Sequence, residues 1–411
     1  MDESQKLDVN DHRRLGQELD LFVFSDLVGS GLPLFTPRGT VLRDELMGFS
    51  EELQRKNGFQ KVAIPHITKD ELYKRSGHWD KFGDELFLVK SQETSDQMVL
   101  KPMNCPHHIQ IYASRPRSYR ELPIRYMENT IQYRDEKKGE LAGLSRVRSI
   151  SIDDAHIFCR LDEIEQEFTT IMEMIKEMYG VFGLKFRARL SFRDDSDGYL
   201  GEKANWDSAQ KTIEDVAKKL GLEYFIGEGD AAFYGPKIDI MVSALGKEHQ
   251  LATEQLDFVM PERFGLTYTD KDGSEKPLVI IHKALLGSFE RFLSVYLEHT
   301  GGKFPVWLAP EQIRVATLND DEAVMKLAKE IVAKAEELGL RAELDDSNES
   351  VGKKIHDAEA MKVPYTLVIG GKEVESARLT ARARSDLKEL AEATVEEFLQ
   401  QVAEEAKSRS N

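Results

Sequence analysis

Residues 133–159 bring together side chains that bind anions and metal ions. The stretch opens with Arg134 and Glu136, passes through a turn that contains glycine, and reads DDAH at 153–156. Guanidinium groups hold phosphates through paired hydrogen bonds, and carboxylates with an imidazole bind metals, amines and hydroxyls. These residue types suggest a site at which a nucleotide meets a small molecule.

The elements that would position these groups form a predicted β-hairpin. Two β-patterned segments flank the turn, and alternation along the second arm places Arg146, Arg148 and Ile150 on one face. A charged hairpin can equally be solvated surface, and a DDAH run can equally be a turn or the capped start of a helix. The spacing alone leaves both interpretations open.

The charge of the whole chain argues against a protein that coats nucleic acid. Its 411 residues carry a formal net charge of -17, which repels a polyanion. Within residues 101–148, however, ten Lys or Arg stand against five Asp or Glu, which is a net charge of +5. A basic segment on an acidic protein is typical of a protein that binds a polyanion at one site.

Cysteine usage and hydropathy indicate the compartment. Cys105 and Cys159 provide no disulfide framework, which favours a reducing environment. Residues 1–20 contain no apolar signal segment, and no run approaches the roughly eighteen apolar residues of a membrane span. We therefore expect a cytoplasmic protein without a membrane span.

The pattern of elements changes at 304–313, FPVWLAPEQI. Before it, amphipathic helices such as 40–57 alternate with strands and long polar loops. After it, strands and helices alternate regularly, with a last helix from Asp386 to the end of the chain. We therefore predict an α+β protein with two domains, residues 1–305 and 306–411.

Motifs in both predicted domains resemble those of threonyl-tRNA synthetases, a family of class II aminoacyl-tRNA synthetases. The three class II signatures correspond to a helix, strand and proline at 40–65, YRDE with RVR at 133–148, and GSFER at 287–291. The threonyl-specific motifs are MNCPHH at 103–108, DDAHIFC at 153–159, FYGPKID at 233–239, TEQLDF at 253–258, IIHKALLGSFER at 280–291 and FPVWLAP at 304–310. Their shared order over residues 12 to 400 makes chance a poor explanation.

This resemblance implies the fold and the reaction. The fold is an antiparallel six-stranded sheet flanked by helices, followed by a C-terminal α/β anticodon-binding domain, in a homodimer. The reaction is the ATP-dependent attachment of L-threonine to threonine tRNA through a threonyl-adenylate. The implied zinc ligands are Cys105, His156 and His282, which leave a fourth coordination position open. Mg²⁺ accompanies ATP.

The resemblance also assigns the other site residues. The implied catalytic residues are Arg134, Arg291, Gln250 and Lys237. The implied substrate-binding residues are Asp154, Tyr234, Gln255, Glu136, Arg146 and Ser288. The implied anticodon contacts are Glu375 and Arg384. In this scheme Arg134 holds the α-phosphate, Arg291 holds the γ-phosphate, and Asp154 accepts the threonine hydroxyl proton, which valine lacks.

Two positions depart from the family pattern. Ile150 replaces an aromatic residue that stacks on adenine, a loss of about 1 kcal/mol, and Ile152 replaces a glutamine near the threonyl group. The chain also begins at the catalytic core, so we expect no N-terminal editing domain and no visible means of rejecting serine.

Three functions therefore stay open at this point. The first is an active threonine-tRNA ligase. The second is a weakly active or inactive paralogue that binds RNA or regulates, motivated by Ile150 and Ile152. The third is a class II enzyme that charges another amino acid. Amino-acid-dependent ATP-pyrophosphate exchange separates them.

Overall fold

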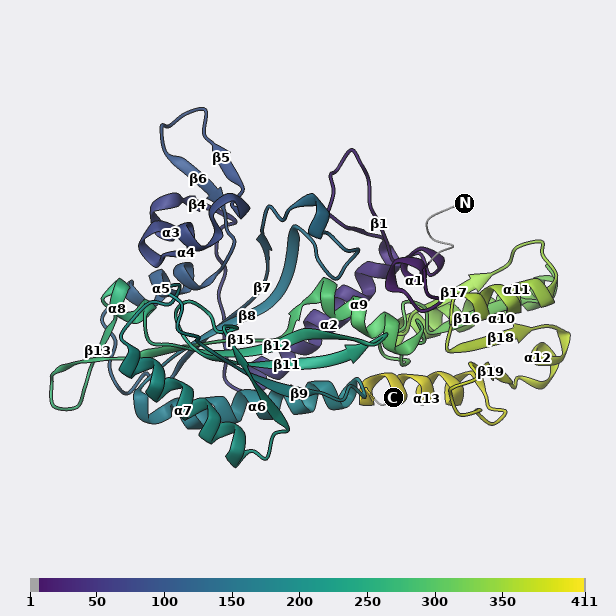
Figure 1. Cartoon of the computed structure of the whole chain (residues 1–411). Coiled ribbons are helices and arrows are strands. Elements are labelled where there is room, and N and C mark those ends of the chain that lie inside the picture. Colours follow the sequence, from purple (N-terminus) through teal and green to yellow (C-terminus); the bar gives the residue numbers. More distant parts are fainter. Residues whose placement is uncertain (1–6, 410–411) are drawn as a thin grey trace. The chain divides into compact units, whose positions relative to one another are not determined.

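The computed structural model describes residues 7–409 (Figure 1). They form two compact units, each with its own set of packed elements. Unit 1 comprises the described residues of Met1–Val23, Leu34–Leu46 and Tyr296–Asn411; unit 2 comprises Phe24–Pro33 and Met47–Val295.

Unit 2 is built on one eight-stranded sheet. Its strands, in spatial order, are β10 (Tyr224–Glu228), β9 (Arg187–Phe192), β11 (Lys237–Ala244), β12 (Lys247–Asp257), β15 (Val279–Ser288), β8 (Ser149–Cys159), β7 (Ile124–Tyr133) and β3 (Gln60–Lys61). The six strands from β9 to β7 pair antiparallel, while β10 and β3 join the edges in parallel. The predicted antiparallel six-stranded sheet is confirmed, and a parallel strand at each edge makes the whole sheet mixed.

Helices cover this sheet as their apolar periodicity predicts. Helix α6 (Ile164–Val181) buries Phe168, Ile171 and Ile175 and packs against β12 and β15, while α7 (Lys203–Lys219) packs against α6 and β9 (Figure 1).

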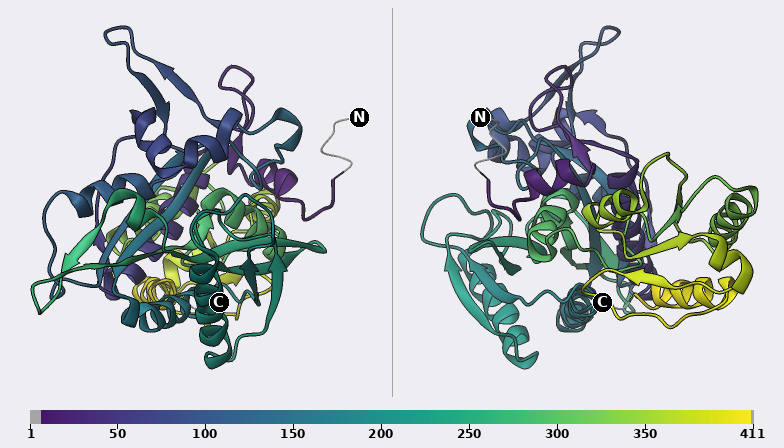
Figure 2. Two further views of the ribbon diagram at one scale, coloured as in Figure 1. Left: turned by 60° about the vertical axis from the view of Figure 1, so that its left-hand side comes forward. Right: turned by 90° about the vertical axis from the view of Figure 1, so that its right-hand side faces the viewer.

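A smaller layer lies between β3 and β7 of the large sheet in sequence. Strands β4 (Ile67–Lys69), β6 (Gln97–Leu100) and β5 (Leu88–Lys90) form a three-stranded sheet. Figure 2 shows β5 and β6 as a projecting hairpin. The helices α3 (Asp70–Ser76) and α4 (His78–Phe82) lie between β4 and β5 in sequence, and α5 (Cys105–Ala113) follows β6. This layer carries side chains that reach the site described below.

The predicted hairpin exists, but its second arm is shorter than expected. Strands β7 and β8 pair from Ile124 with Phe158 to Tyr133 with Ser149. Arg146 and Arg148 precede β8, so the prediction that they alternate along a strand is wrong. The backbone N–H of Arg148 donates instead to Gly31 O at 2.8 Å, and the Arg146 carbonyl accepts from Ala142 N at 3.2 Å. One bond to a residue far away in sequence and one within the segment hold residues 142–148 as a loop.

The C-terminal part of unit 1 is an α/β domain, as predicted. Its sheet has the order β17 (Ala342–Asp345), β16 (Ile313–Thr317), β18 (Tyr365–Ile369), β19 (Ala381–Ala383), with only β19 antiparallel. The helices of this domain include α10 (Glu322–Glu337), α11 (Val351–Ala360), α12 (Gly371–Ser376) and α13 (Val395–Ser408). Buried residues from strands and helices, among them Ile313, Ile331, Leu367 and Phe398, share one core.

Two helix boundaries differ from the sequence prediction. Helix α2 (Pro37–Lys56) begins three residues before the predicted start at residue 40. The last helix begins at Val395 rather than Asp386, because the side chain of Thr394 caps it by accepting from Glu397 N. Residues 410 and 411 lie outside the described residues. No helix within residues 7–409 is long and apolar enough to cross a membrane.

Candidate metal and nucleotide site

Three buried side chains that can bind a metal converge in unit 2. Cys105 begins α5, while His156 and His282 face each other across β8 and β15 as directly paired residues. The two imidazole centroids are 4.7 Å apart. One ligand atom of each of the three residues lies within 4.8 Å of the others. The triad implied by the resemblance therefore exists as a geometric cluster.

The hydrogen bonds of the two histidines leave one nitrogen of each ring open. His156 Nδ1 is 2.8 Å from His108 Nδ1, and His282 Nε2 is 2.8 Å from Asp257 Oδ2. His156 Nε2 and His282 Nδ1 are buried and have no hydrogen-bond partner among the described residues. Because buried polar atoms are normally paired, these two nitrogens indicate positions that a ligand completes.

The electrostatics of the cluster fit a zinc ion. Burial lowers the pKa of His156, and the neighbouring His282 and His108 lower it further, so its imidazole is neutral, as a metal ligand must be. Burial raises the pKa of the Cys105 thiol, so a thiolate here requires a neighbouring cation. One sulfur and two imidazole nitrogens with an open fourth position match a catalytic zinc site.

The predicted threonine-binding residues surround this cluster. The hydroxyl of Tyr234 donates to Gln255 Oε1 at 2.6 Å, and its ring stacks on His282 with centroids 4.9 Å apart. Gln255 pairs with His282 across β12 and β15. Asp154 is buried on β8 and accepts from Asn104 Nδ2 at 2.9 Å. A small ligand at the metal would therefore meet a carboxylate that already has a fixed orientation.

Arg134 follows β7, is partly buried, and forms no ion pair with any residue that the structure describes. Its guanidinium carbon lies 4.9 Å from the centroid of the Phe82 ring, and one terminal nitrogen lies 3.2 Å from Met103 Sδ. Its Nε has no hydrogen-bond partner within residues 7–409. Burial lowers the pKa of Arg134, so an anion bound beside it would relieve the cost of the buried charge.

Glu136 and Arg146 are already paired with each other. The distance from the Arg146 terminal nitrogen to Glu136 Oε2 is 2.7 Å, and a second contact joins Arg146 to Glu140 at 2.8 Å. A nucleotide that uses either side chain must share or replace this ion pair.

Arg291, on α9 (Phe289–Thr300), binds only backbone carbonyls within the described residues. It donates to Ser145 O at 3.1 Å and to Gln250 O at 3.3 Å. Burial and the positive charge of Arg146 both lower its pKa. The hydroxyl of Ser288 accepts from the Arg291 backbone N–H at 3.3 Å. Arg134 and Arg291 are close enough that the positive charge of Arg291 lowers the pKa of Arg134. Two neighbouring guanidinium groups favour a bound polyanion.

A buried carboxylate, Asp239, connects two predicted catalytic residues. It accepts from Lys237 Nζ at 2.7 Å, from Gln250 Nε2 at 2.6 Å and from Arg189 at 3.0 Å. Alternation with apolar neighbours groups Asp239 with Tyr234 and Lys237 as polar residues in the sequence, but the resemblance gave Asp239 no role. Alternation along β11 places it on the same face as Lys237, which is the signal that identifies it.

The sequence analysis also left His108 and Asp257 unassigned. Asp257 lies two residues after Gln255 on β12 and so shares its face, which alternation predicts. His108 had no such signal, because its contact with His156 joins α5 to β8 and depends on the tertiary fold.

The two predicted anticodon residues lie in unit 1 and differ in exposure. Glu375, in α12, is exposed. Arg384 follows β19, and only 7% of its side chain is exposed. Its guanidinium donates to Asp386, to Lys362 O at 2.6 Å and to Phe304 O at 2.7 Å. A base that contacts Arg384 must compete with these internal bonds.

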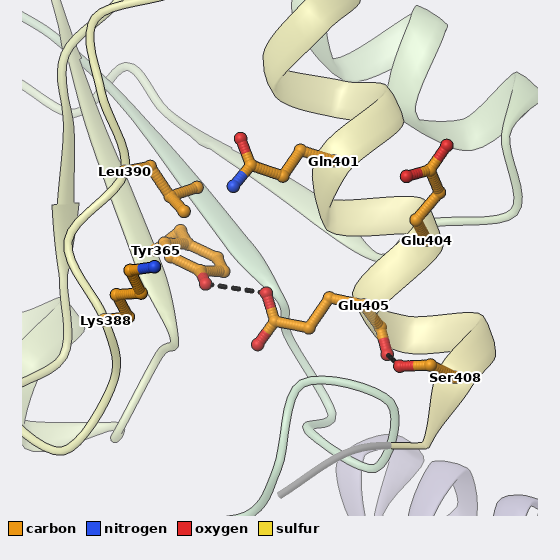
Figure 3. Close-up of a pocket in the computed structure, with 7 residues that line it drawn as sticks. All are labelled: Tyr365, Lys388, Leu390, Gln401, Glu404, Glu405 and Ser408. Carbon is orange, nitrogen blue, oxygen red and sulfur yellow. Dashed lines mark hydrogen bonds between the residues drawn. The ribbon is translucent and has the colours of Figure 1, made fainter.

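A pocket of about 440 Å³ lies elsewhere in the same unit and includes neither residue. It lies between Tyr365 on β18 and α13, where the tyrosine hydroxyl donates to Glu405 at 2.8 Å (Figure 3). The Ser408 hydroxyl also donates to the backbone carbonyl of Glu405, and no cluster of metal-binding side chains lies among the described residues of this pocket.

Two protein-family descriptions match separate parts of the chain. The family description "tRNA synthetase class II core domain (G, H, P, S and T)" matches residues 87–300, and "Anticodon binding domain" matches residues 312–405. The threonine–tRNA ligase of Thermus thermophilus is 48% identical over 380 residues, which are 91% of this chain and 57% of that protein. The chain thus spans less than two thirds of the length of this relative.

Solved structures of similar proteins span the chain almost completely. The structure titled as the RNA binding domain of threonyl-tRNA synthetase from Cryptosporidium parvum has a TM-score of 0.90 and 36% identity, over 96% of this chain and 98% of that one. A putative threonyl-tRNA synthetase from Aeropyrum pernix has a TM-score of 0.85 and 30% identity, over 97% of each chain.

Proposed function

Because the chain belongs to the threonyl-tRNA synthetase family of class II aminoacyl-tRNA synthetases, we propose that it attaches L-threonine to threonine tRNA in an ATP-dependent reaction. The intermediate is a threonyl-adenylate. The observation that supports this function best is the buried cluster of Cys105, His156 and His282 beside Asp154. Two other sets of residues complete the proposal, one for ATP and one for tRNA.

Cys105, His156 and His282 are the proposed zinc ligands. A zinc ion held there would act as a Lewis acid toward the amino and hydroxyl groups of threonine. Asp154, held by Asn104, accepts a hydrogen bond from the threonine hydroxyl. Valine has no hydroxyl to donate to this carboxylate, so we expect discrimination on the order of 10⁴-fold.

The guanidinium groups position ATP. Arg134 holds the α-phosphate beside the threonine carboxylate, and Arg291 holds the γ-phosphate, with Mg²⁺ sharing the charge. The threonine carboxylate oxygen then attacks the α-phosphorus, and pyrophosphate leaves. Gln250 lies near the reacting carboxylate and Lys237 near the nucleotide, and Asp239 orients both. Positioning and charge stabilisation are the main contributions of the protein to such a step.

The remaining substrate contacts come from the loop between β7 and β8 and from strands β8 and β15. Glu136 lies near adenine, and Arg146 exchanges part of its ion pair with Glu136 for nucleotide contacts. The hydroxyl of Ser288 supports Arg291 by accepting a hydrogen bond from the backbone N–H of Arg291. Ile150, on β8, gives adenine an apolar contact in place of an aromatic one.

Residues 306–411 are the proposed anticodon-binding domain, and residues 1–305 the proposed catalytic domain. Glu375 and Arg384 are the proposed contacts to anticodon bases, since a carboxylate and a guanidinium can read the edges of unstacked bases. We also propose a cytoplasmic homodimer, which size-exclusion chromatography with light scattering tests directly.

Amino-acid-dependent ATP-pyrophosphate exchange tests the proposed function. Each amino acid is supplied separately, without tRNA, and threonine is expected to support exchange. No exchange with any amino acid would favour a paralogue that binds RNA or regulates, as Ile150 and Ile152 suggest. Exchange with a different amino acid would favour a sister class II enzyme.

A further inference from the structure

We propose that His108 and Glu128 form a buried relay that fixes the tautomer in which His156 binds zinc. This inference rests on the zinc site of the proposed function and names two positioning residues that the motifs did not assign. His108 lies on α5 and Glu128 on β7, and both are buried.

The first step of the relay is the contact between two imidazoles. His156 Nδ1 and His108 Nδ1 are 2.8 Å apart, and the rings meet edge to face at 86°. A neutral imidazole has one nitrogen that donates and one that accepts. Between two neutral rings at this distance, one Nδ1 therefore carries the shared proton and the other accepts it.

Metal binding decides which ring donates. His156 Nε2 is the nitrogen of that ring without a partner among the described residues, and it needs a free lone pair to bind zinc. The proton of His156 must then lie on Nδ1, which donates to His108 Nδ1. His108 is consequently an acceptor at Nδ1 and carries its own proton on Nε2.

Glu128 stabilises that tautomer of His108. Its Oε2 is 3.9 Å from His108 Nε2, and neither atom has a hydrogen-bond partner in the described part of the chain. Its other oxygen accepts from Ile64 N at 2.9 Å, and Lys101 Nζ lies 3.8 Å from Oε2. Although burial opposes ionisation, the contacts with His108, Ile64 and Lys101 lower the pKa of Glu128. A carboxylate here attracts a proton onto the facing nitrogen.

The other zinc-binding histidine has a shorter connection to a carboxylate. His282 Nε2 donates directly to Asp257 Oδ2 at 2.8 Å, and Asp257 Oδ1 accepts from the backbone N–H groups of Val259 and Met260. Each histidine ligand is therefore oriented by its own partner, directly for His282 and through His108 for His156. Such partners raise ligand basicity and metal affinity.

His107 provides a matched control, because it is the adjacent residue on α5 and is also buried. Its two ring nitrogens have no hydrogen-bond partner within residues 7–409. A variant at His107 removes a buried imidazole from the same turn without removing a contact to His156. If zinc affinity falls in the His108 variant but not in the His107 variant, the loss is due to the relay and not to general packing.

The experiment measures zinc affinity of the full chain by competition with a chromophoric chelator. We expect His108→Ala to weaken zinc binding by about 10- to 100-fold. His108→Asn keeps an acceptor and should restore much of the affinity, Glu128→Gln should cause a smaller loss, and His107→Ala should bind zinc like the wild type. Circular dichroism checks that each variant is folded.

Wild-type affinity in His108→Ala, or an equal loss in His107→Ala, would overturn the relay. If His108→Ala does not fold, an unchanged affinity in folded Glu128→Gln would overturn it as well. Threonine activation is measured separately, so a chain that binds zinc through the relay but activates no threonine would contradict only the proposed function. A wild-type chain that binds no zinc would overturn both.

Discussion

The cluster of Cys105, His156 and His282 in unit 2 and the Arg384 region of unit 1 differ in how their buried polar groups are paired. In unit 2, His156 Nε2, His282 Nδ1 and Arg134 Nε have no hydrogen-bond partner among the described residues. In unit 1, the guanidinium of Arg384 is bonded to a carboxylate and two backbone carbonyls. The first region has polar atoms that a ligand could pair with, whereas the guanidinium of the second is already paired within the protein.

This difference separates two kinds of dependence. Unsatisfied buried groups cost free energy until a ligand binds, so ligand binding and stability are linked in unit 2. Groups that pair internally contribute to stability whether or not RNA is present. Loss of a ligand should therefore reduce the activity of unit 2, whereas loss of the Arg384 side chain should lower the folding stability of unit 1.

Zinc removal should have the largest effect. After treatment with a chelator, we expect threonine-dependent ATP-pyrophosphate exchange to fall by about 100-fold or more, because a Lewis acid worth several kcal/mol is lost. Added zinc should restore it. Binding of threonine tRNA, measured by filter retention, should change little. A metal-free chain that remains fully active would contradict the proposed role of the cluster.

Arg134→Lys and Arg291→Lys should each reduce exchange by roughly 100-fold, because an ammonium cannot replace a bidentate guanidinium at a buried phosphate. Circular dichroism should show an intact fold. Arg187→Lys is a matched control, since Arg187 is exposed on β9 and pairs with Glu248 at 2.8 Å. Normal exchange in both site variants would refute their assignment.

Arg384→Ala should destabilise unit 1 by about 2–4 kcal/mol, because it removes several largely buried hydrogen bonds. Thermal unfolding measures this loss. Under conditions where the variant is folded, we expect weaker aminoacylation of threonine tRNA and nearly unchanged ATP-pyrophosphate exchange, which uses no tRNA. If both reactions fall together, or neither does, Arg384 is not an anticodon contact.

Glu375→Gln should have the smallest effect. Because Glu375 is exposed, stability should be unchanged, while the KM for threonine tRNA should rise about fivefold through loss of about 1 kcal/mol of base contact. Glu389→Gln, at another exposed carboxylate of unit 1, should leave aminoacylation at the wild-type level. Equal effects in the two variants would indicate nonspecific electrostatics instead of base recognition.

Periodicity predicted the elements well, and its failures have local causes. The regular alternation after residue 313 predicted β16 through β18 and their helices correctly. It failed after Ala383, because a backbone pairing of Leu379 with Ala393 and the contact of Arg384 with Asp386 hold an irregular segment before α13. The local signal for the later helix start was Thr394 followed three residues on by Glu397, a capping box.

The site was less accessible to sequence reasoning than the fold. No spacing rule connects Cys105, His156 and His282, so only the resemblance grouped them, and the fold then placed them together. Alternation could have identified Asp257, and it groups Asp239 with Tyr234 and Lys237. The contact between His108 and His156 could not be predicted, because it depends on how α5 packs against β8.

Cobalt substitution tests most directly the claim that the metal held by Cys105, His156 and His282 recognises threonine. The ligand-field absorption of the cobalt-substituted chain reports changes in the coordination of the ion. We predict one shift of these bands on saturation with threonine, which offers an amino and a hydroxyl group, and a different, smaller shift with valine, which offers only its amino group. No shift with threonine, or the same shift with valine, would contradict the claim.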